Sequence, residues 1–437
     1  MRNTGFGMCD IRIGIVGAGA SGLAMAHFLA EAGYDNVVLF ERRERIGGKC
    51  ESITIDGQVY ELGAVFGAPH YKVIGGLAGR VGLEHGRCVP GHYYSPDGQR
   101  TAMFPRQKFP ALLWQLFAKL AALSAYKYHA VYEPGLAEIH PELYENFETF
   151  ASRYGLAEVP VFFQQITTGF GYGYAEQVPA AYMMKYLSRP MILDCARGKG
   201  YIWPAGIQTL WERLSGEHEV LLGAEAQRVT RGDKVLVATT RGQFELDVLI
   251  LACPLDEALD FLDAAPEERE LFSRIRTYDY WVLLCEITGL PRDIGYIRAN
   301  FAACNQGHLM IWYCRCLGAR YYTLYVLGDG RTSQDVIEAN CASDLGRLGA
   351  RLEKVVEARR WSYFPHVETA DMAGGFYERL EALQGQRHTY YCGEIMSFST
   401  LECCAYYAQD LVDRFFKENS KSANQRISIS AAQLFSS

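Results

Sequence analysis

The chain has 437 residues, enough for two domains with separate cores, and its composition is that of a globular protein. The net charge of −7, without any Lys/Arg cluster, argues against nucleic acid as a partner. No apolar run approaches the roughly 20 residues of a membrane-spanning helix, and the N-terminal residues show no signal-peptide pattern. The 13 cysteines are scattered, odd in number and without CxxC spacing. We therefore expect buried thiols, no metal site and a reducing, cytoplasmic compartment.

The first motif lies near the N-terminus. An apolar run over 11–16 precedes the sequence GAGASG and an apolar helix-forming segment. In such a strand–turn–helix unit Gly17 permits the tight turn, Gly19 lets the backbone approach a pyrophosphate, and Gly22 lets helix and strand pack closely. A second predicted strand ends at Glu41, whose carboxylate can accept hydrogen bonds from ribose hydroxyls. The sequence therefore predicts a dinucleotide site, NAD or FAD, formed with Glu41 by the turn residues Gly17, Ala18, Gly19, Ala20, Ser21 and Gly22.

The sequence after this strand narrows the choice of cofactor. Glu41 begins the segment ERRERIGGK, which resembles the extended fingerprint of the amine-oxidase and phytoene-desaturase flavoproteins. In that family the glycine pair passes close to the cofactor phosphates and a basic residue follows it. The sequence YELGA further on resembles the part that brings backbone past the flavin. The resemblance implies that the cofactor is FAD, with contacts from Arg42, Gly48, Lys49, Gly63, Ala64 and Val65.

The C-terminal part supplies a further candidate cofactor segment. A strand predicted over 389–391 leads through Gly393 and Glu394 into a helix that runs from about Leu401 to residue 416. Ser399 or Thr400 is the expected N-cap. Gly393 would give the backbone room beside the pyrophosphate, and the helix N-terminus would stabilise negative charge on a reduced flavin.

Cofactor segments at both ends of the chain predict an α/β fold. It would combine a discontinuous Rossmann-type FAD-binding domain with an α+β substrate domain on a mixed sheet, in an amine-oxidase-like arrangement. Short strands predicted over 218–253, the last of them at 244–251, return to the FAD domain in that family, where Ala226 would face the adenine. The predicted boundaries are 8–66, 196–258 and 383–417 for the FAD domain, 67–195 and 259–382 for the substrate domain with a helical cap, and 418–437 for a disordered tail.

Three aromatic segments, 162–174, 310–316 and 321–326, predict strands of a sheet with one buried face. Cys314 and Cys316 would then share a face of one strand. A wall of this kind suits an apolar ligand, and its rings also suit an amine through cation–π contacts.

A helix is predicted over 109–128, with Leu113, Phe117 and Leu120 on one side and lysines nearby. Packing within the substrate domain is the expected role of this side, and peripheral docking on a membrane to collect lipid is the alternative.

Four longer segments resemble, more narrowly, the bacterial polyunsaturated fatty acid isomerases, which are FAD enzymes; they are 168–187, 203–214, 361–367 and 390–398. The resemblance implies a redox-neutral reaction, in which a methylene-interrupted polyene loses hydride to flavin N5 and regains it at another carbon as a conjugated isomer. The protein would hold the chain roughly 3–3.5 Å from N5 and exclude water. Amine oxidases place a lysine near N5, and the matching segment YDYWVLLCEI has none.

The resemblance is weaker where the substrate would enter. The isomerases carry an arginine near the entrance, for which only Arg87 and His92 are available here, and Cys195 stands where they have an aromatic gate. The predicted substrate-binding residues are Arg87, Phe170, Tyr172 and Cys195.

Three functions remain open at this point. The first is an FAD-dependent double-bond isomerase of a polyunsaturated fatty acid or similar polyene, with an apolar small molecule as its partner. The second is an FAD oxidase or dehydrogenase of the amine-oxidase type, and the third is a flavoprotein whose FAD is structural or sensory. No protein residue is expected to act as an essential acid or base, since His70, His366 and Glu394 are the nearest candidates and each has a structural explanation. The oligomeric state is open.

Overall fold

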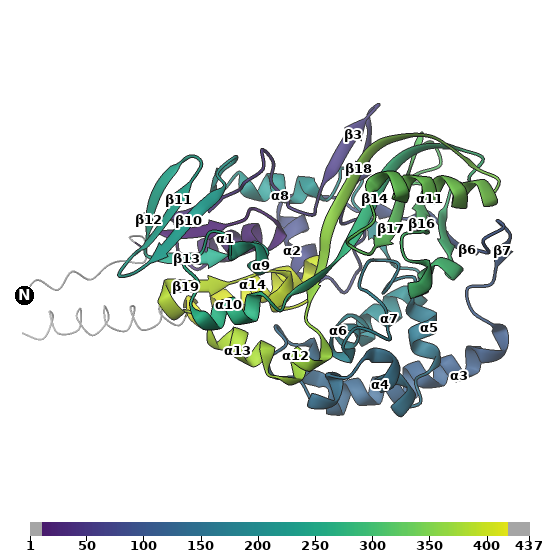
Figure 1. Ribbon diagram of the computed structural model, residues 1–437, viewed down its shortest axis with the longest axis horizontal. Coiled ribbons are helices and arrows are strands. Elements are labelled where there is room, and N and C mark those ends of the chain that lie inside the picture. Colours follow the sequence, from purple (N-terminus) through teal and green to yellow (C-terminus); the bar gives the residue numbers. More distant parts are fainter. Residues whose placement is uncertain (1–10, 418–437) are drawn as a thin grey trace, which may run out of the picture. The chain divides into compact units, whose positions relative to one another are not determined.

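The structure is a computed structural model that describes residues 11–417. The predicted disordered tail, 418–437, lies outside the described residues. Two compact units are present (Figure 1). Unit 1 comprises the chain up to Gly48, Leu210–Ser273 and the chain from Arg379, and unit 2 comprises Lys49–Thr209 and Arg274–Glu378.

These limits differ from the predicted boundaries at four places. Residues 49–66 and 196–209 group with unit 2, and residues 259–273 and 379–382 group with unit 1. The differing segments are all connections where the chain leaves one unit for the other, and such connections carry no periodic pattern that fixes a boundary.

Unit 1 is built on a parallel sheet of five short strands in the order β19-β13-β1-β2-β9. They are β1 (Ile13–Val16), β2 (Val37–Phe40), β9 (Glu219–Leu221), β13 (Val248–Leu251) and β19 (Thr389–Tyr391). β1 and β2 are buried at every position, as a parallel sheet covered on both faces requires. Because strands from the beginning, middle and end of the chain alternate in one sheet, the predicted discontinuous α/β domain is confirmed.

The rest of unit 1 is helical apart from a small antiparallel sheet, β10 (Ala226–Arg231), β11 (Val235–Thr239) and β12 (Gly242–Leu246). The strand predicted over 244–251 is in fact two strands, β12 and β13. Asp247 separates them: its carboxylate accepts a 2.9 Å hydrogen bond from the backbone N–H of Arg12, where the chain passes between the sheets. The helices are α1 (Ala20–Glu31), α8 (Gln208–Ser215), α9 (Leu255–Ala258), α10 (Pro266–Phe272), α13 (Phe376–Ala382) and α14 (Leu401–Phe415).

Unit 2 contains a seven-stranded mixed sheet in the order β18-β14-β17-β16-β15-β6-β7. β15 and β6 pair in parallel and all other neighbours are antiparallel, which confirms the predicted mixed sheet. The two longest strands, β14 and β18, run side by side as curved ribbons (Figure 1). The strands are β6 (Gly91–Tyr94), β7 (Arg100–Thr101), β14 (Arg276–Thr288), β15 (Ile294–Ile297), β16 (Leu309–Tyr313), β17 (Tyr321–Gly328) and β18 (Arg351–His366).

Helices and two small antiparallel sheets complete unit 2. One is the hairpin of β3 (Ser52–Ile55) and β4 (Gln58–Glu61), and the other pairs β5 (Gly86–Arg87) with β8 (Tyr201–Ile202), which is distant in sequence. Helix α11 (Gln334–Arg347) packs on β16 and β18. The other helices are α2 (Lys72–Arg80), α3 (Phe109–Trp114), α4 (Phe147–Arg153), α5 (Glu158–Phe163), α6 (Ala180–Tyr186), α7 (Arg189–Ala196) and α12 (Thr369–Ala373).

The aromatic segments differ from their prediction. All residues of β16 and β17 are buried, not one face only, because α11 lies on this sheet and other chain segments cover its opposite side. Cys314 follows the end of β16, so Cys314 and Cys316 do not share a strand face. Residues 162–174 are the end of α5 followed by turns instead of a strand, since Gly171 and Gly173 adopt positive φ angles that interrupt an extended chain.

The helix predicted over 109–128 is present, but its buried and exposed sides differ from the prediction. Leu120 is buried as expected, whereas Leu113 and Phe117 are exposed and Leu112 and Leu116 pack inward. Within residues 11–417, the helix Arg106–Lys127 is also long and apolar enough, by length and composition, to cross a membrane. Lys119 interrupts the apolar residues of this helix, so the sequence contains no uninterrupted apolar run of that length.

A buried ion cluster joins the small sheet of unit 1 to a helix. The guanidinium of Arg231, on β10, lies 2.6 Å from a carboxylate oxygen of Asp263 and 2.6 Å from one of Glu268 on α10. Tyr391 of β19 donates a 2.5 Å hydrogen bond to Glu268. These contacts hold the pKa of Glu268 below its ordinary value although burial acts to raise it. Removing the arginine would leave the buried Glu268 carboxylate with only a more distant cation, the Arg387 guanidinium at 3.8 Å.

We predict that Arg231→Met lowers the free energy of unfolding by about 3–5 kcal/mol, because the buried Glu268 charge loses its two short contacts with the guanidinium. Urea unfolding of purified protein measures this. Arg228, on the same strand but exposed, provides the matched control, and Arg228→Met should change the value by less than about 0.5 kcal/mol. Equal effects of the two substitutions would contradict the assignment of the buried cluster.

Candidate functional site

The glycine-rich turn of unit 1 brings backbone segments together without side chains between them. A Cβ at Gly22 would lie 2.0 Å from the carbonyl oxygen of Gly17, so α1 packs against the end of β1 only with glycine there. Gly17 has a φ of +105°, which a side chain would strain. A Cβ at Gly19 would lie 3.7 Å from the Cα of Gly48, in ordinary van der Waals contact. The two glycine turns therefore lie side by side and leave exposed backbone for a phosphate to approach.

The Glu41 side chain fixes the second side of this site. Its carboxylate oxygens accept 2.9 Å hydrogen bonds from the backbone N–H groups of Ala18 and Arg43. The Glu41 carbonyl accepts a 2.8 Å bond from Ala224 N–H, two residues before the predicted adenine contact Ala226. The structure thus brings the first turn, Glu41 and the start of β10 together as the fingerprint predicts.

Other predicted cofactor residues of unit 1, Ala20, Ser21 and Leu401, belong to two helices that pack on each other. α14 begins at Leu401, and its N-cap is Thr400, whose hydroxyl accepts a hydrogen bond from the backbone N–H of Cys403. α14 packs along α1, and the Ser21 hydroxyl bonds to the thiol of Cys404, partly offsetting the rise in that thiol's pKa caused by burial. Two helix N-termini, each with a partial positive charge, therefore lie close together in unit 1.

Three further predicted cofactor residues lie in unit 1. Gly393 has a φ of +148°, and a Cβ there would meet nothing within 4 Å, which leaves the room that the sequence analysis assigned to the pyrophosphate. Arg42 pairs with Glu257 at 2.7 Å on the surface. Glu394 follows in a 3-10 turn, η10 (Glu394–Met396), directly before α14. The residues of unit 1 fit a dinucleotide held against exposed backbone.

In unit 2 the other cofactor residues cluster at the start of the unit. A Cβ at Gly63 would lie 1.8 Å from the carbonyl oxygen of Lys49, and that carbonyl accepts a 3.0 Å bond from Ala64 N–H. Val65 is buried, and the Lys49 ammonium lies 5.4 Å from the centre of the Tyr363 ring. The YELGA segment is thus packed backbone to backbone against Lys49.

Sequence reasoning missed a buried ion pair inside the same segment. Glu61 is 1% exposed, and burial raises its pKa to about 6 although Arg315 lies 3.4 Å away. Glu61 also accepts hydrogen bonds from the Ser52 hydroxyl and from the backbone N–H of Ile207. The pair fixes the loop that carries Gly63. The only sequence signal was an acidic residue inside a strand, which is common on surfaces.

One face of the large sheet is lined with tyrosines. Residues directly opposite each other on paired strands share a face, and so do residues two apart on one strand. The register places Tyr93 opposite Tyr296, and Ile311 opposite both Tyr296 and Tyr325. Ring contacts agree, with centroid separations of 5.1 Å for Tyr93–Tyr296 and 6.0 Å for Tyr280–Tyr325. We call this the tyrosine face; it comprises Tyr93, Tyr280, Tyr296, Tyr313, Tyr325 and Tyr363.

The predicted substrate residues Phe170 and Tyr172 lie directly over the tyrosine face. Tyr172 stacks on Tyr363 at 5.9 Å, and Phe170 stacks on Phe66 at 5.6 Å. A Cβ at Gly171 would lie 2.8 Å from the rings of both Tyr280 and Tyr363, so only glycine lets the chain pass this close. The structure therefore brings these two residues into one aromatic wall, where turns hold them instead of the strand predicted over 162–174.

This wall is uncharged at neutral pH. Burial raises the pKa of five of its hydroxyls above the ordinary value, those of Tyr93, Tyr280, Tyr296, Tyr313 and Tyr325. Beside them, burial lowers the pKa of His366 to about 4, with a smaller contribution from Arg276, although the hydrogen bond to Phe364 O opposes it. Neutral His366 donates from Nδ1 to that oxygen at 2.8 Å and stacks on Tyr278 at 5.0 Å. None of these groups is poised to exchange protons near pH 7.

The residues predicted at the substrate entrance are less clearly grouped in space than the residues of the tyrosine face. Arg87 is exposed on β5, and Cys195 is exposed on α7 with its sulfur 3.4 Å from that of Met191. His92 is bound by the buried carboxylate of Asp293 at 2.8 Å, so it serves the fold. Sequence reasoning missed Arg298, whose guanidinium lies 5.1 Å from the centre of the Tyr93 ring. An isolated arginine in an irregular segment carries no signal of this contact.

The remaining candidate bases also have structural partners. His70 Nδ1 lies 2.8 Å from the Asp194 carboxylate, which also accepts the His70 backbone N–H at 3.0 Å. The contact ties the start of α2 to α7.

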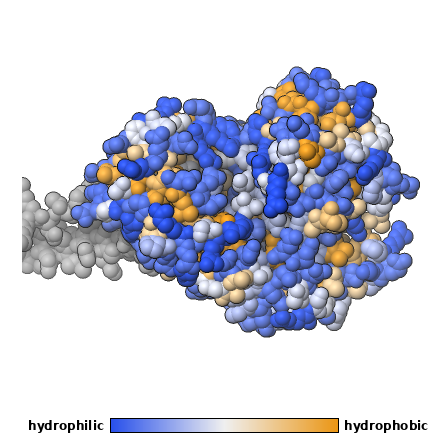
Figure 2. Space-filling model, in the orientation of Figure 1, coloured by the Kyte–Doolittle hydropathy of each residue, from blue (hydrophilic) through white to orange (hydrophobic). Residues whose placement is uncertain are grey.

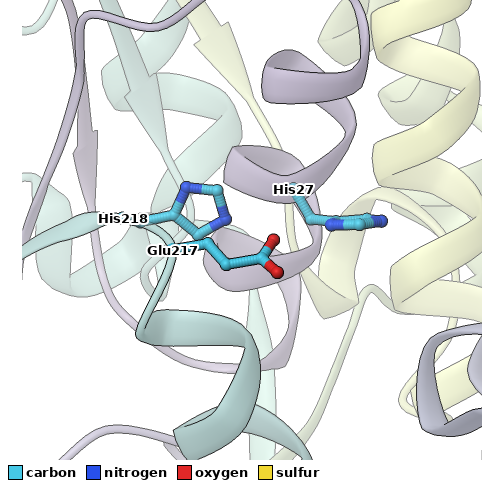
Figure 3. Close-up of side chains that lie close together, drawn as sticks. All are labelled: His27, Glu217 and His218. Carbon is cyan, nitrogen blue, oxygen red and sulfur yellow. The ribbon is translucent and has the colours of Figure 1, made fainter. Parts of the chain in front are cut away.

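A cluster of possible metal ligands occurs elsewhere in unit 1. Ligand atoms of His27, Glu217 and His218 lie within 4.8 Å of one another, and the Glu217 carboxylate lies between the two imidazoles in Figure 3. His27 Nε2 is also 3.4 Å from the Glu31 carboxylate. His27 stands eight residues after Gly19, about 12 Å along the helix axis. The cluster joins α1 to the turn before β9 and is separate from the cofactor site.

Comparison with known proteins gives this arrangement its family. The family model "Flavin containing amine oxidoreductase" matches residues 20–290, more than half of the chain. The chain therefore belongs to the flavin-containing amine oxidoreductases, and its cofactor is FAD.

Two solved structures and one curated protein show how the chain is related within this family. The crystal structure of the CLA-producing fatty acid isomerase from P. acnes matches with a TM-score of 0.90 and 34% identity, over 94% of this chain and 100% of that one. This confirms the resemblance to the fatty acid isomerases. Beta-cyclopiazonate dehydrogenase of Aspergillus oryzae is 27% identical over 89% of each chain. A putrescine oxidase double mutant matches with a TM-score of 0.68 at 18% identity, over 92% of this chain and 99% of that one, and so shares the fold.

We predict that Gly19→Ala weakens FAD binding at least about tenfold without altering the fold. The new methyl group fits beside Gly48 but occupies the approach to the phosphates. Titration of cofactor-free protein with FAD measures the affinity, and the thermal midpoint of the cofactor-free protein should not change. Gly79→Ala, at a helical glycine with nothing within 4 Å of its Cβ position, is the control and should bind FAD normally. Unchanged binding by Gly19→Ala would contradict the phosphate assignment.

We predict that His366 destabilises the protein in acid and that His366→Gln removes this effect. Its folded-state pKa of about 4 is lower than the ordinary 6.5, so the unfolded chain binds the proton first and stability falls as pH drops from about 6.5 to 4. The contribution lost is about 3 kcal/mol. The free energy of unfolding of wild type relative to that of the variant, measured across this pH range, should fall by about 3 kcal/mol on acidification. Turnover should stay within about tenfold, and a hundredfold loss with FAD bound would identify His366 as a catalytic base.

Proposed function

We propose that the protein is an FAD-dependent isomerase that converts a methylene-interrupted polyunsaturated fatty acid, or a similar polyene, to a conjugated isomer. The observation that carries the proposal is the match to the CLA-producing fatty acid isomerase over 94% of the chain at a TM-score of 0.90. A match of this extent includes the substrate unit as well as the cofactor unit, whereas matches at lower identity support the fold alone.

The aromatic wall supports an apolar substrate with a cationic transition state. A long hydrocarbon chain gains from burial against the tyrosine face and Phe170, because the side chains that form this surface are aromatic rings. The faces of tyrosine rings carry negative charge density, so they stabilise a positive charge that develops on the hydrocarbon. The buried rings also exclude water, which would otherwise trap such a cation.

Bound FAD supplies a hydride acceptor at N5 that can return the hydride to a different carbon. The N-termini of α1 and α14 place partial positive charge in the cofactor unit, which suits the negative charge of a diphosphate and a reduced flavin. Strand β14 contains no lysine that would resemble the oxidases' N5 lysine. These features support hydride return in preference to transfer of electrons to oxygen.

Two groups near the wall suit the polar end of a fatty acid. Arg298 is a cation held against Tyr93. The hydroxyls of Tyr93 and Tyr313 are buried and have no hydrogen-bond partner among residues 11–417. A carboxylate that reached them would accept their O–H groups and satisfy two buried donors. Arg298 therefore joins Arg87 as a candidate for head-group recognition.

The second candidate function is an FAD dehydrogenase or oxidase. The full-length similarity to Beta-cyclopiazonate dehydrogenase favours it, since that protein's name is that of an enzyme that removes electrons from its substrate. The same aromatic wall would hold an amine or another apolar compound. The two functions differ in the fate of the electrons, which an assay can follow directly.

Two predictions from the sequence, the cellular compartment and the reaction partner, are part of the proposal. All twelve cysteines that the structure describes are free thiols, which fits a reducing, cytoplasmic setting. The only partner needed for the reaction is the small apolar substrate.

We predict that linoleic acid, added to the FAD-loaded protein without oxygen, gives conjugated diene while the flavin stays oxidised at steady state. Returning the hydride leaves no net reduction, so product forms over many turnovers without an electron acceptor. Absorbance of conjugated dienes in the ultraviolet and of the flavin in the visible are recorded together. Stearic acid, which has no double bond, is the matched control and should give no signal.

Lasting bleaching of the flavin without diene would show net oxidation and favour the dehydrogenase. Hydrogen peroxide formed in air in proportion to substrate consumed would favour the oxidase. Either result, with FAD bound stoichiometrically, would overturn the isomerase.

A further inference from the structure

An apolar face of the helix Arg106–Lys127 is exposed on the surface of unit 2. The helix consists of α3, η3 (Gln115–Leu120) and η4 (Leu123–Lys127), the last two with π-helical turns. Trp114 is 63% exposed and Phe117 is 50% exposed, while Leu112 on the opposite side is 1% exposed. Large aromatic side chains exposed to this extent on one helix face are typical of an interaction surface.

The exposed and buried sides remain separate along the helix. Exposed Phe109, Leu113 and Phe117 recur every four residues, and the buried positions Leu112, Leu116, Leu120 and Ser124 do the same. A regular α-helix of 3.6 residues per turn would rotate such a series by roughly 40° at each step. The wider turns of η3 and η4 reduce this drift, so each series stays on one side.

Neighbouring residues extend the apolar face. Val161 of α5, the helix packed beside α3, is 40% exposed, and Met103 just before the helix is also 40% exposed. We call this surface the docking face; it comprises Met103, Phe109, Leu113, Trp114, Phe117 and Val161. Apolar side chains interrupt the charged surface over the part of unit 2 that holds α3 and α5 (Figure 2).

All charged residues of the helix that carries most of the docking face are basic. The segment 106–127 has four basic residues and no acidic one, in a chain whose net charge is −7. Lys108 and Lys127 pair with Glu158 and Glu142 near its two ends, and Arg106 is exposed at its start. The Lys119 ammonium turns aside to the carbonyl oxygen of Gly155 at 3.2 Å. Basic residues thus flank the aromatic face without lying across it, as in helices that lie at a lipid interface.

We propose that the docking face rests on the surface of a lipid bilayer, with the helix parallel to the membrane and Trp114, Phe117 and Leu113 inserted among the acyl chains. Trp at this position suits the boundary between headgroups and hydrocarbon. The helix does not cross the bilayer, because Leu112, Leu116 and Leu120 are already buried against unit 2.

Docking would bring the enzyme to where its substrate is concentrated. Long-chain fatty acids and other polyenes partition into bilayers, so a docked enzyme meets far more of them than a free one does. The docking depends only on this face and stands whichever reaction the flavin performs.

The test uses the FAD-loaded protein and vesicles of phosphatidylcholine with about one-third phosphatidylglycerol. We expect wild type to float with the vesicles in a density gradient. The double variant Trp114→Ser/Phe117→Ser should bind at least about tenfold less. The matched control Leu317→Ser/Val336→Ser replaces two side chains of unit 2 that are 73% and 48% exposed outside the docking face, and it should float like wild type.

Flavin content and the thermal midpoint are measured in the same samples, so loss of fold is distinguished from loss of docking. Bromine-labelled lipid should quench part of the wild-type tryptophan fluorescence, and Trp114→Phe should abolish that part. Carbonate at high pH should release the protein, as it does a peripheral protein. Three results would overturn the proposal: wild type that does not float, double-variant binding equal to wild type, or gel filtration in which the double variant converts a dimer to a monomer without vesicle binding. The last result would make the docking face an interface between copies of this chain.

Discussion

The cofactor unit depends on a backbone contact at its first turn that leaves no space for a side chain. With a Cβ position at Gly22 only 2.0 Å from the Gly17 carbonyl, α1 can start directly at the end of β1. No rotamer change relieves a clash between backbone and Cβ, so this constraint is absolute in a way that side-chain packing is not. From it follow the position of the α1 N-terminus, the contact of Gly19 with the second glycine turn, and the hydrogen bond from Ala18 N–H to Glu41.

Unit 2 is organised by the corresponding contact between a glycine-containing turn and aromatic rings. Gly171 and Gly173 let the chain lie against Tyr280, Tyr363 and Tyr278 at distances that no other residue permits. The turn therefore covers the tyrosine face and contributes Phe170 and Tyr172 to it. Burial raises the pKa of five tyrosine hydroxyls of this wall and lowers the pKa of His366, so these groups stay neutral near pH 7. A neutral aromatic wall binds and shields a substrate, and it leaves the bond-breaking chemistry to the cofactor.

The family fold by itself does not choose between isomerisation and oxidation. Both kinds of enzyme need a flavin, an apolar site and exclusion of water, and the putrescine oxidase structure shares the fold at 18% identity. The two kinds of enzyme differ in whether the reduced flavin reacts first with oxygen or with a nearby carbocation. This depends on the few groups that face the flavin. The exposed face of α3 concerns the supply of substrate and not the choice of reaction. A substrate of very low solubility has to be collected before it can react.

The sequence by itself determined the local features in which each residue acts on its chain neighbours. The glycine turn and the strand Thr389–Tyr391 were predictable, and the N-cap of α14 was narrowed to Ser399 or Thr400, because φ restrictions, strand runs and capping bonds are local. Tertiary structure alone decided what covers each element. The segment 162–174 is rich in aromatic residues, but it forms turns that lie over the large sheet. Strands β16 and β17 are buried on both faces. Leu113 and Phe117 are exposed although they are apolar. Hydrophobicity shows that a side chain gains from burial, but it contains no information on which surface is available to bury it.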